Sequence, residues 1–344
     1  MGRYIARRLL QAIPLLAIIA VIVFFLLKTT GDPLTILATD PRVREADRAL
    51  LRAKFGLDEP VFPHQFVTWL IGDDWRDRDY DGDGIPDRPG ELRGILRLDF
   101  GNSFRYQRPV LEVVGMFLPN TLILGITAYI VTLIFSLAIG MYASLRPYTA
   151  VDNIITGLAF ITFSMPIFLI ALLLVQIFAV WFREWGLPYL PVQGMYSARG
   201  DRTILELARH MVLPVMSLSL ISIAGYSRYI RATMLEVINS DYIRTARAKG
   251  LVERRVVFLH ALKNASLPII TLVGLDIPFI LSGAVVTEGI FSWPGMGRLF
   301  INSLEFSDAP VLIFFVLMTA VAVVAFQLIT DILYAWLDPR VRYQ

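Results

Sequence analysis

The chain has 344 residues, 56% of them hydrophobic, and its mean hydropathy of +0.61 is too high for a soluble domain of ordinary composition. Its formal net charge is only +3, and the basic side chains gather at the ends of apolar runs. This distribution argues against nucleic-acid binding and favours oriented insertion into a membrane. There is no cysteine, which excludes disulfides and thiolate metal sites, and no GxxxxGKS or GxxxxGKT motif, so the chain has no P-loop of its own.

The first apolar run covers residues 9–27 and, at about 28 Å as a helix, is long enough to cross the hydrocarbon core. It follows Arg3, Arg7 and Arg8, which predict a cytoplasmic N-terminus. A cleaved signal peptide is the competing interpretation. The length of the run, and the absence of a small-residue cleavage site before Lys28, favour a membrane-spanning helix.

A large polar insertion follows this first span, over residues 28–118, and the predicted topology places it outside the cytoplasm. Aromatic and aliphatic residues are interleaved over residues 61–71, which suits a helix lying at the membrane interface. The glycine and proline within residues 99–109 predict a turn that leads back to the membrane surface.

Five further apolar segments predict five more spans, which makes an all-α membrane protein of six transmembrane helices with both termini in the cytoplasm. The five segments are residues 121–145, 154–181, 211–227, 267–286 and 310–336. Residues 187–194 and 288–299 are expected to be external connections.

Two spans contain residues that suit a substrate pathway. Ser164 and Pro166 lie in the middle of the third span, where a proline kinks the helix, either for the pathway or for structure alone. Asp276 lies within the fifth span, where an ionisable group is costly. It is either a pathway residue that meets a cationic substrate group, such as a peptide's amino terminus, or a carboxyl that is paired with another span or kept protonated by burial.

Between the fourth and fifth spans lies a basic stretch, residues 240–268, whose sequence predicts a helix, a glycine stop and a second helix. Ser240 can cap the first helix, with Asp241 at its positive end. Gly250 supplies the left-handed stop, and Leu251 folds back on the last turn. An amphipathic second stretch follows. The arginines predict a cytoplasmic location, where a partner is needed to cover the element.

This stretch resembles the "EAA" loop of ABC importer permeases, in the form found in dipeptide, oligopeptide and nickel permeases. The matching residues are the YIRTARAKGL sequence that begins at Tyr242, followed by His260, Asn264 and Pro268. Residues 244–246 are Arg-Thr-Ala where the name-giving pattern has Glu-Ala-Ala, a departure that is usual in the peptide branch. In the family this loop is the coupling helix, which docks into an ATPase subunit.

The resemblance extends over residues 3–342, is interrupted mainly at residues 72–94, and includes the segments 99–109, 288–299 and 337–342. It implies that the chain is the first of two unlike permeases of a peptide-type importer. It also implies that the chain has three regions. These are residues 1–27, the cytoplasmic N-terminus and first helix; 28–118, the extracytoplasmic insertion; and 119–344, a permease core of five helices with its coupling loop at 232–266.

The resemblance also implies the partners and the mechanism. A second homologous permease, two ABC ATPase subunits and an extracytoplasmic substrate-binding protein would complete the importer in the inner (plasma) membrane. The partners would hydrolyse ATP, and this chain, which is no enzyme, would bind none. Alternating access would carry the substrate across. The coupling residues would be Tyr242, Arg244, Thr245, Ala246, Arg247, Ala248, Lys249, Gly250 and Leu251.

Within this loop the small and basic residues suit different tasks. Ala246 and Ala248 would leave room for close docking, and Gly250 would set the angle between the two helices. Arg247 and Lys249 would pair with acidic residues of the ATPase.

An acidic segment of the insertion, DRDYDGDGIPD at residues 77–87, predicts a structural calcium site within residues 77–91. It resembles the DxDxDGxxD loops of dockerin and thrombospondin type 3 repeats, although Gly90 stands where an EF-hand has glutamate. A solvated acidic loop is the alternative. The expected ligands are Asp79, Asp81, Asp83, the carbonyl of Ile85, and Asp87, with Asp77 and Glu91 as further candidates.

Other functions are kept as alternatives. Nickel or another small solute is the second substrate class within the family, although only His64, His210 and His260 could supply imidazole. A channel or secondary transporter that works alone would need no coupling loop. A membrane enzyme is disfavoured because no HExxH or GxSxG motif occurs.

Overall fold

The computed structural model describes residues 2–29, 44, 59–78, 88–90, 93–198, 200–265 and 267–337. The chain divides into two units by its internal contacts. The core unit comprises Phe117–Ile301 and Ala322–Gln344, and the N-terminal unit comprises Gly2–Met116 and Asn302–Val321.

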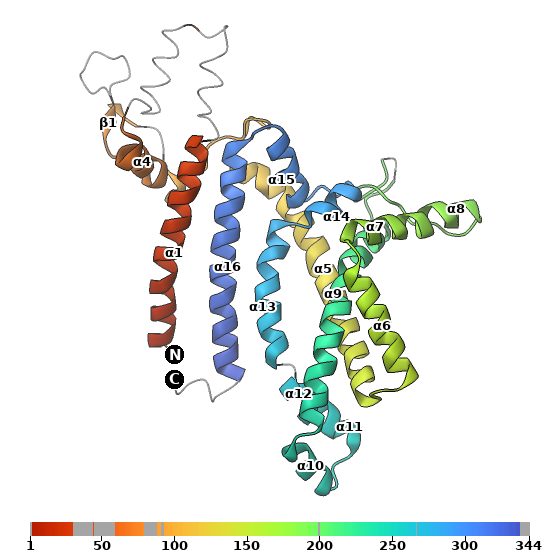
Figure 1. Cartoon of the computed structure of the whole chain (residues 1–344). Helices are drawn as coiled ribbons and strands as arrows, with labels where there is room; N and C mark the ends of the chain where they lie inside the picture. Colours follow the sequence, from red (N-terminus) through yellow and green to blue (C-terminus); the bar gives the residue numbers. More distant parts are fainter. Residues whose placement is uncertain are drawn as a thin grey trace. The chain divides into compact units, whose positions relative to one another are not determined.

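Six helical segments among the described residues are long and apolar enough to cross a membrane, as predicted. They are Arg7–Leu26, Val110–Leu145, Ile167–Glu184, Ile204–Ile238, Leu272–Ile290 and Ala309–Ile332. The described residues are otherwise helical or irregular, except for one antiparallel ribbon of two-residue strands, β1 (Asp77–Arg78) and β2 (Arg88–Pro89). The predicted all-α class is therefore confirmed (Figure 1).

In the N-terminal unit, α1 (Gly2–Thr29) packs against the predicted helix at residues 61–71, which forms as η1 (Val61–Gln65) and α4 (Phe66–Ile71). The ring of Phe24 lies 5.3 Å from that of Phe66 and 5.4 Å from that of Trp69, measured between centroids. A single-turn helix, η2 (Ile95–Arg97), follows.

The predicted turn at residues 99–109 also forms in this unit. The buried carboxylate of Asp308 accepts hydrogen bonds from the Ser103 hydroxyl at 2.5 Å and from the Phe104 amide at 3.0 Å. Asn102 and Pro109 pair across the turn. One buried acid therefore holds the segment that leads into α5 (Val110–Leu145).

The prediction of one continuous third span is wrong, because the helix breaks in its middle. α6 (Ala150–Ser164) ends before Met165, whose φ of −82° and ψ of 135° are extended. The ring of Pro166 disfavours a helical conformation at the preceding residue, which explains the break. The chain then continues as α7 (Ile167–Val175), η3 (Gln176–Trp181) and α8 (Phe182–Glu184), which run in a different direction from α6 (Figure 1).

The second and fourth spans are longer than predicted, as α5 (Val110–Leu145) and α9 (Ile204–Ile238). They pack closely where Gly140 of α5 meets α9, because an added Cβ there would lie 2.7 Å from the Ser227 carbonyl oxygen. α6 is joined to α9 by Arg231, whose Nε and Nη2 each donate to the Asp152 carboxylate at 2.6 Å.

The last part of the core unit contains α13 (Leu267–Ser282), α14 (Val285–Ile290) and the start of α15 (Met296–Glu305). The C-terminal part of α16 (Ala309–Leu337), from Ala322 on, also belongs to this unit. The connection predicted at residues 288–299 is mostly helical, since only residues 291–295 separate α14 from α15. Trp293 in this connection is fully buried, and its Nε1 donates to the Asn120 carbonyl at 2.9 Å.

Candidate functional site

The basic stretch between α9 and α13 folds into two short helical pieces joined at a glycine, as predicted. The first piece is α10 (Asp241–Ala248), and it stops at Gly250, whose φ of +75° is left-handed. The Gly250 amide donates to the Arg247 carbonyl at 2.9 Å, and the Leu251 amide to the Ala246 carbonyl at 3.4 Å. This pair of bonds is the Schellman arrangement that commonly ends a helix at glycine.

Ser240 occupies the N-cap position of α10, but its predicted capping bond does not form. Its hydroxyl instead donates to the Val237 carbonyl at 2.6 Å, near the end of α9. The Ser240 side chain therefore links the start of α10 to the end of α9, because its hydroxyl bonds to a carbonyl earlier in the chain.

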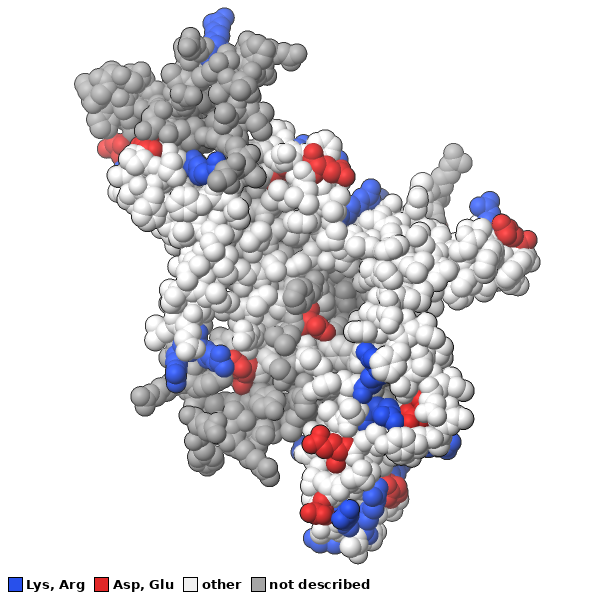
Figure 2. All heavy atoms as spheres, in the orientation of Figure 1, with Lys and Arg blue, Asp and Glu red and all other residues white. Residues whose placement is uncertain are grey.

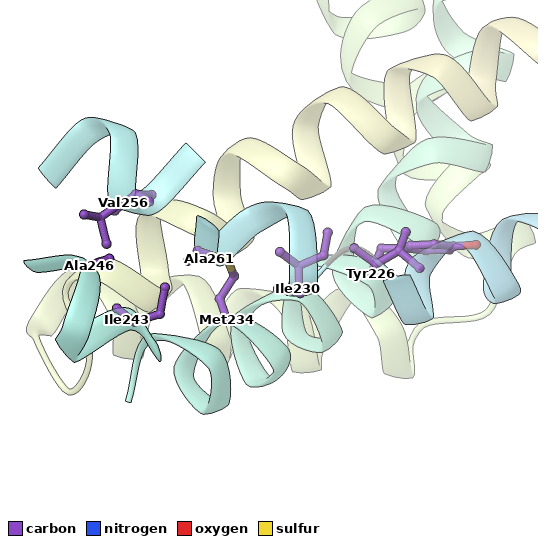
Figure 3. Packing of buried hydrophobic residues seen from close by; sticks show 10 residues of the cluster. Tyr226, Ile230, Met234, Ile243, Ala246, Val256 and Ala261 are labelled. Carbon is purple, nitrogen blue, oxygen red and sulfur yellow. The ribbon is translucent and has the colours of Figure 1, made fainter. Parts of the chain in front are cut away.

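The second helical piece runs through α11 (Glu253–Arg255), η4 (Val256–Ala261) and α12 (Leu262–Ala265). Its apolar side packs with α10 and with the C-terminal half of α9 around one buried cluster (Figure 3). The cluster consists of Tyr226, Ile230, Met234, Ile243, Ala246, Val256, Val257, Ala261, Ala265 and Ile269. We call the two helical pieces, residues 241–265, the basic loop.

The outward side of the basic loop is charged, and Figure 2 shows Lys and Arg side chains gathered over α10 and α11. Among the predicted coupling residues, those with exposed side chains are Tyr242, Arg244, Thr245, Arg247, Ala248 and Lys249. Ala246 differs from the expectation that it faces a docking partner, because it is buried in the cluster. Its small side chain therefore serves the packing of the basic loop itself.

Arg247 already has an acidic partner within the chain. Its Nη2 and Nε donate to the Glu253 carboxylate at 2.7 and 3.1 Å, across the Gly250 stop. This guanidinium holds the pKa of the Glu253 carboxyl below its usual value, and the carboxylate raises the pKa of Arg247. Lys249, in contrast, has no acidic side chain within ion-pair distance among the described residues, and it remains available to a partner.

A cavity of about 340 Å³ lies between α5, α9, α13 and α14. Tyr226 of α9 donates its hydroxyl to the Asp276 carboxylate of α13 at 2.5 Å, and the same hydroxyl lies 3.0 Å from that of Tyr129 on α5. The cavity is lined by Thr121, Leu124, Gly125, Ala128, Tyr129, Thr132, Leu218, Ser222, Asp276, Ile280, Gly283, Ala284 and Glu288.

Of the three predicted pathway residues, only Asp276 lines this cavity. Ser164 ends α6, and its hydroxyl donates to the Phe160 carbonyl at 2.8 Å. Pro166 directly precedes α7 and is exposed. Tyr129 was not singled out from the sequence, although a tyrosine hydroxyl within an apolar span needs a polar partner, and that need was a usable signal.

Glu288 was also not singled out, because the sequence places it at the start of a polar connection. Its side chain is fully buried. Its Oε1 accepts from the Thr121 hydroxyl at 2.9 Å, and its Oε2 from the Arg298 amide at 3.1 Å. An added Cβ on Gly295 would lie 2.5 Å from Oε2, so that glycine makes room for the carboxylate. These contacts join α5, α14 and α15.

Histidines do not form a metal site in the described part of the chain. The Nδ1 of His210 lies 3.1 Å from the carbonyl oxygens of both Gln193 and Gly194, which is a structural role. Among the described residues no group of three or more His, Asp or Glu side chains is placed to hold a metal ion.

The predicted calcium ligands Asp79, Asp81, Asp83, Ile85, Asp87 and Glu91 lie outside the described residues, whereas Asp77 lies in β1. β1 pairs with β2 so that Asp77 faces Pro89 and Arg78 faces Arg88. The two ends of the acidic segment are therefore held side by side.

Comparison with known families and proteins gives matches along the whole chain. Residues 136–343 match the family described as "Binding-protein-dependent transport system inner membrane component", and residues 1–125 match the N-terminal region of such membrane components. The chain is 39% identical over 345 residues to the oligopeptide transport system permease protein AppB of Bacillus subtilis. It is 33% identical over 366 residues to the dipeptide transport system permease protein DppB of Escherichia coli, and 36% identical over 346 residues to the glutathione transport system permease protein GsiC of Salmonella paratyphi A. Each alignment covers 100% of both chains.

Proposed function

The chain belongs to the family of inner membrane components of binding-protein-dependent transport systems, and from this membership we propose that it is one permease subunit of an ATP-driven importer of di- and oligopeptides. It is a multi-pass membrane protein. The relatives named for oligopeptide, dipeptide and glutathione transport support a peptide substrate over nickel. The observation that carries the proposal is the basic loop, whose exposed face stands on a packed internal core.

The exposed face of the basic loop is the surface that docks with an ATPase subunit. Tyr242 is 46% exposed, and the side chains of Arg244, on the same short helix, and Lys249, at its C-cap, are exposed too. Basic side chains at such a surface attract an acidic groove and fix the orientation of the partner. The chain supplies no P-loop, so the ATP is bound and hydrolysed by that partner.

The buried cluster explains how ATP-driven motion reaches the spans. Ile243 of α10 and Val256 of η4 pack with Ile230 and Met234 of α9, and each of these four side chains is 0% exposed. Close-packed apolar contacts of this kind transmit displacement because they resist compression. When the ATPase subunits close, the basic loop and the end of α9 move together, and alternating access follows.

The distribution of charge sets the orientation of the proposed subunit. The basic loop and the arginines before α1 are cytoplasmic, both termini lie on that side, and residues 28–118 are external. The membrane is the plasma membrane, the inner one where there are two. A second, unlike permease completes the pathway, and an external binding protein delivers the peptide.

Purification and reconstitution of the complex test this function. The tagged chain, isolated in mild detergent, should bring with it a second permease and P-loop ATPases. In liposomes the complex should take up trialanine only with ATP and the binding protein. Recovery of the chain alone, active in liposomes without ATP, would instead establish a self-sufficient channel or secondary transporter.

A matched pair of charge reversals tests the docking surface. Arg244→Glu should release the ATPases and abolish uptake, because it places an acid against an acidic groove. Arg202→Glu reverses an exposed arginine shortly before α9 and should leave the complex intact. Equal retention of the ATPases by both variants would contradict docking at the basic loop.

We further propose that the acidic segment in the insertion binds a calcium ion as a structural support. The pairing of β1 with β2 supports this, because it brings together the ends of a segment with carboxylates at alternate positions. Asp79, Asp81, Asp83 and Asp87, with the Ile85 carbonyl, would hold the ion, and Asp77 and Glu91 are further candidates.

Terbium luminescence tests the calcium proposal, since Trp75 lies two residues before β1 and can sensitise a nearby lanthanide. Emission that calcium displaces is the expected result, and Asp81→Asn together with Asp83→Asn should abolish it. Emission unchanged in that double variant would reject the site.

A further inference from the structure

The cavity between α5, α9, α13 and α14 is lined by acidic side chains without basic ones beside them. Among the described residues, its lining includes two carboxyl groups, those of Asp276 and Glu288, and no lysine, arginine or histidine. Among the residues that the structure describes, Asp276 has no cationic side chain within ion-pair distance. An ionisable group within a span is costly unless it meets water or a compensating charge.

The two carboxylates differ in what they can still bind. Glu288 is fully buried, and both of its oxygens accept hydrogen bonds from Thr121 and from backbone amides. Asp276 is partly exposed, and within the part of the chain that the structure describes it accepts a hydrogen bond from Tyr226 alone. A carboxylate has about four lone-pair sites, so Asp276 retains capacity for another donor.

Two tyrosines hold the Asp276 carboxylate in place. Because Tyr226 donates its single hydroxyl proton to Asp276, the Tyr129 hydroxyl at 3.0 Å must donate to Tyr226. This chain of donors links three helices and ends at the cavity. The carboxylate is therefore positioned before any ligand arrives.

The rest of the lining selects the kind of cation. Hydroxyls of Thr132 and Ser222 add oxygen acceptors, while Leu124, Leu218 and Ile280 are apolar. A hard metal ion is usually held by several carboxylates, and among the described residues no group of three or more His, Asp or Glu side chains is placed to hold one. A primary ammonium needs only about three acceptors, and its carbon body suits apolar walls. The volume of about 340 Å³ admits such a group with its adjoining residue.

We propose that this cavity is a subsite for the protonated amino terminus of the transported peptide, with Asp276 as the binding residue and Tyr226 and Tyr129 as positioning residues. The inference rests on the proposed function as a peptide permease. A single carboxylate that already accepts one hydrogen bond holds an ammonium only weakly, which suits a group that must pass onward.

Charge-selective thiol labelling tests this subsite without the binding protein. Because the chain has no cysteine, Ser222→Cys places its one thiol in the cavity. In the assembled complex, the cationic ethylammonium methanethiosulfonate should label this thiol at least about tenfold faster than the anionic ethylsulfonate reagent, relative to the same ratio at the exposed control Tyr148→Cys. Adding Asp276→Asn should collapse that preference, and Tyr226→Phe should weaken it.

Peptide protection identifies the group that binds. Trialanine at millimolar concentration should slow labelling at Ser222→Cys, and N-acetyl-trialanine, which has no ammonium, should not. Equal protection by both peptides, no charge preference, or no labelling by either reagent would each overturn the subsite.

Uptake separates failure of this inference from failure of the proposed function. If the complex imports trialanine with ATP, Asp276→Asn should lower the peptide imported per ATP hydrolysed about tenfold. Normal import by Asp276→Asn would reject the subsite and leave the importer standing. No ATP-dependent import by the unmodified complex would reject the importer itself.

Discussion

The Thr121 hydroxyl donates to the Glu288 carboxylate at 2.9 Å, which joins α5 to α14 across 167 residues of sequence. The same hydroxyl accepts a hydrogen bond from the Met296 amide at 2.6 Å. Thr121 and Glu288 are 2% and 0% exposed, so no solvent replaces these bonds if they are lost. One threonine therefore holds the loop between α14 and α15 against α5.

Thr121→Val should destabilise the protein by about 2 kcal/mol, because it leaves the buried Met296 amide without its acceptor and leaves Glu288 Oε1 with only the long 3.3 Å bond from the Ala284 amide. Thermal unfolding in detergent measures the loss. Thr127→Val is the matched control, since the Thr127 hydroxyl donates only to the Ile123 carbonyl of its own helix. Similar losses of stability in the two variants would show that the contacts of Thr121 with Glu288 and Met296 do not stabilise the protein.

Asp152→Asn should also cost about 2 kcal/mol, because it removes the charge that faces Arg231 at 2.6 Å. The Arg231 side chain is 23% exposed, so water can solvate its guanidinium once the opposing charge is gone. The loss of stability is therefore smaller than for a fully buried ion pair. Asp241→Asn is the control, because the Asp241 side chain is 97% exposed, and it should change stability by less than about 0.5 kcal/mol. Chemical denaturation compares the two, and an unchanged midpoint for Asp152→Asn would contradict the prediction.

Gly250→Ala should destabilise the basic loop by about 1 kcal/mol through backbone strain alone. None of the described residues lies within 4 Å of an added Cβ at Gly250, so no clash contributes. Gly283→Ala should cost more, because its φ is +83° and its Cβ would lie 2.3 Å from the Gly297 amide nitrogen. Local hydrogen exchange measures the first effect and global unfolding the second. A larger loss of stability for Gly250→Ala than for Gly283→Ala would contradict the prediction.

Glu253→Gln should loosen the basic loop at neutral pH without changing global stability by more than about 0.5 kcal/mol, since the ion pair with Arg247 is exposed. The pKa of Glu253 is lowered in the folded chain, so the ion pair stabilises at neutral pH and this contribution is lost as pH falls through that lowered pKa. Protection factors of the amides near Gly250 should therefore drop on acidification in the unmodified protein. An identical pH profile in Glu253→Gln would exclude the pair as the cause.

Much of the architecture was predictable because it depends on local properties of the chain. Uncharged runs long enough for the bilayer marked the six spans. Gly250 marked the end of α10, because a left-handed residue there favours glycine. Pro166 marked a disturbance in the third span, but the sequence did not reveal that the helix would break completely at Met165.

The composition of the candidate sites depended instead on contacts between distant residues. Nothing local indicated that Tyr226 and Tyr129 would converge on Asp276, that Glu288 would be buried against Thr121, or that Ala246 would face inward.

The sequence by itself determined the membrane class, the family and the helix–glycine–helix form of the basic loop. Tertiary structure alone decided that both carboxyl groups line one cavity, that Glu288 is saturated with hydrogen bonds, and that Asp276 can accept another. The physical reason is that hydropathy and backbone preference act over a few neighbouring residues, whereas hydrogen-bond partners and burial arise only when separate helices pack.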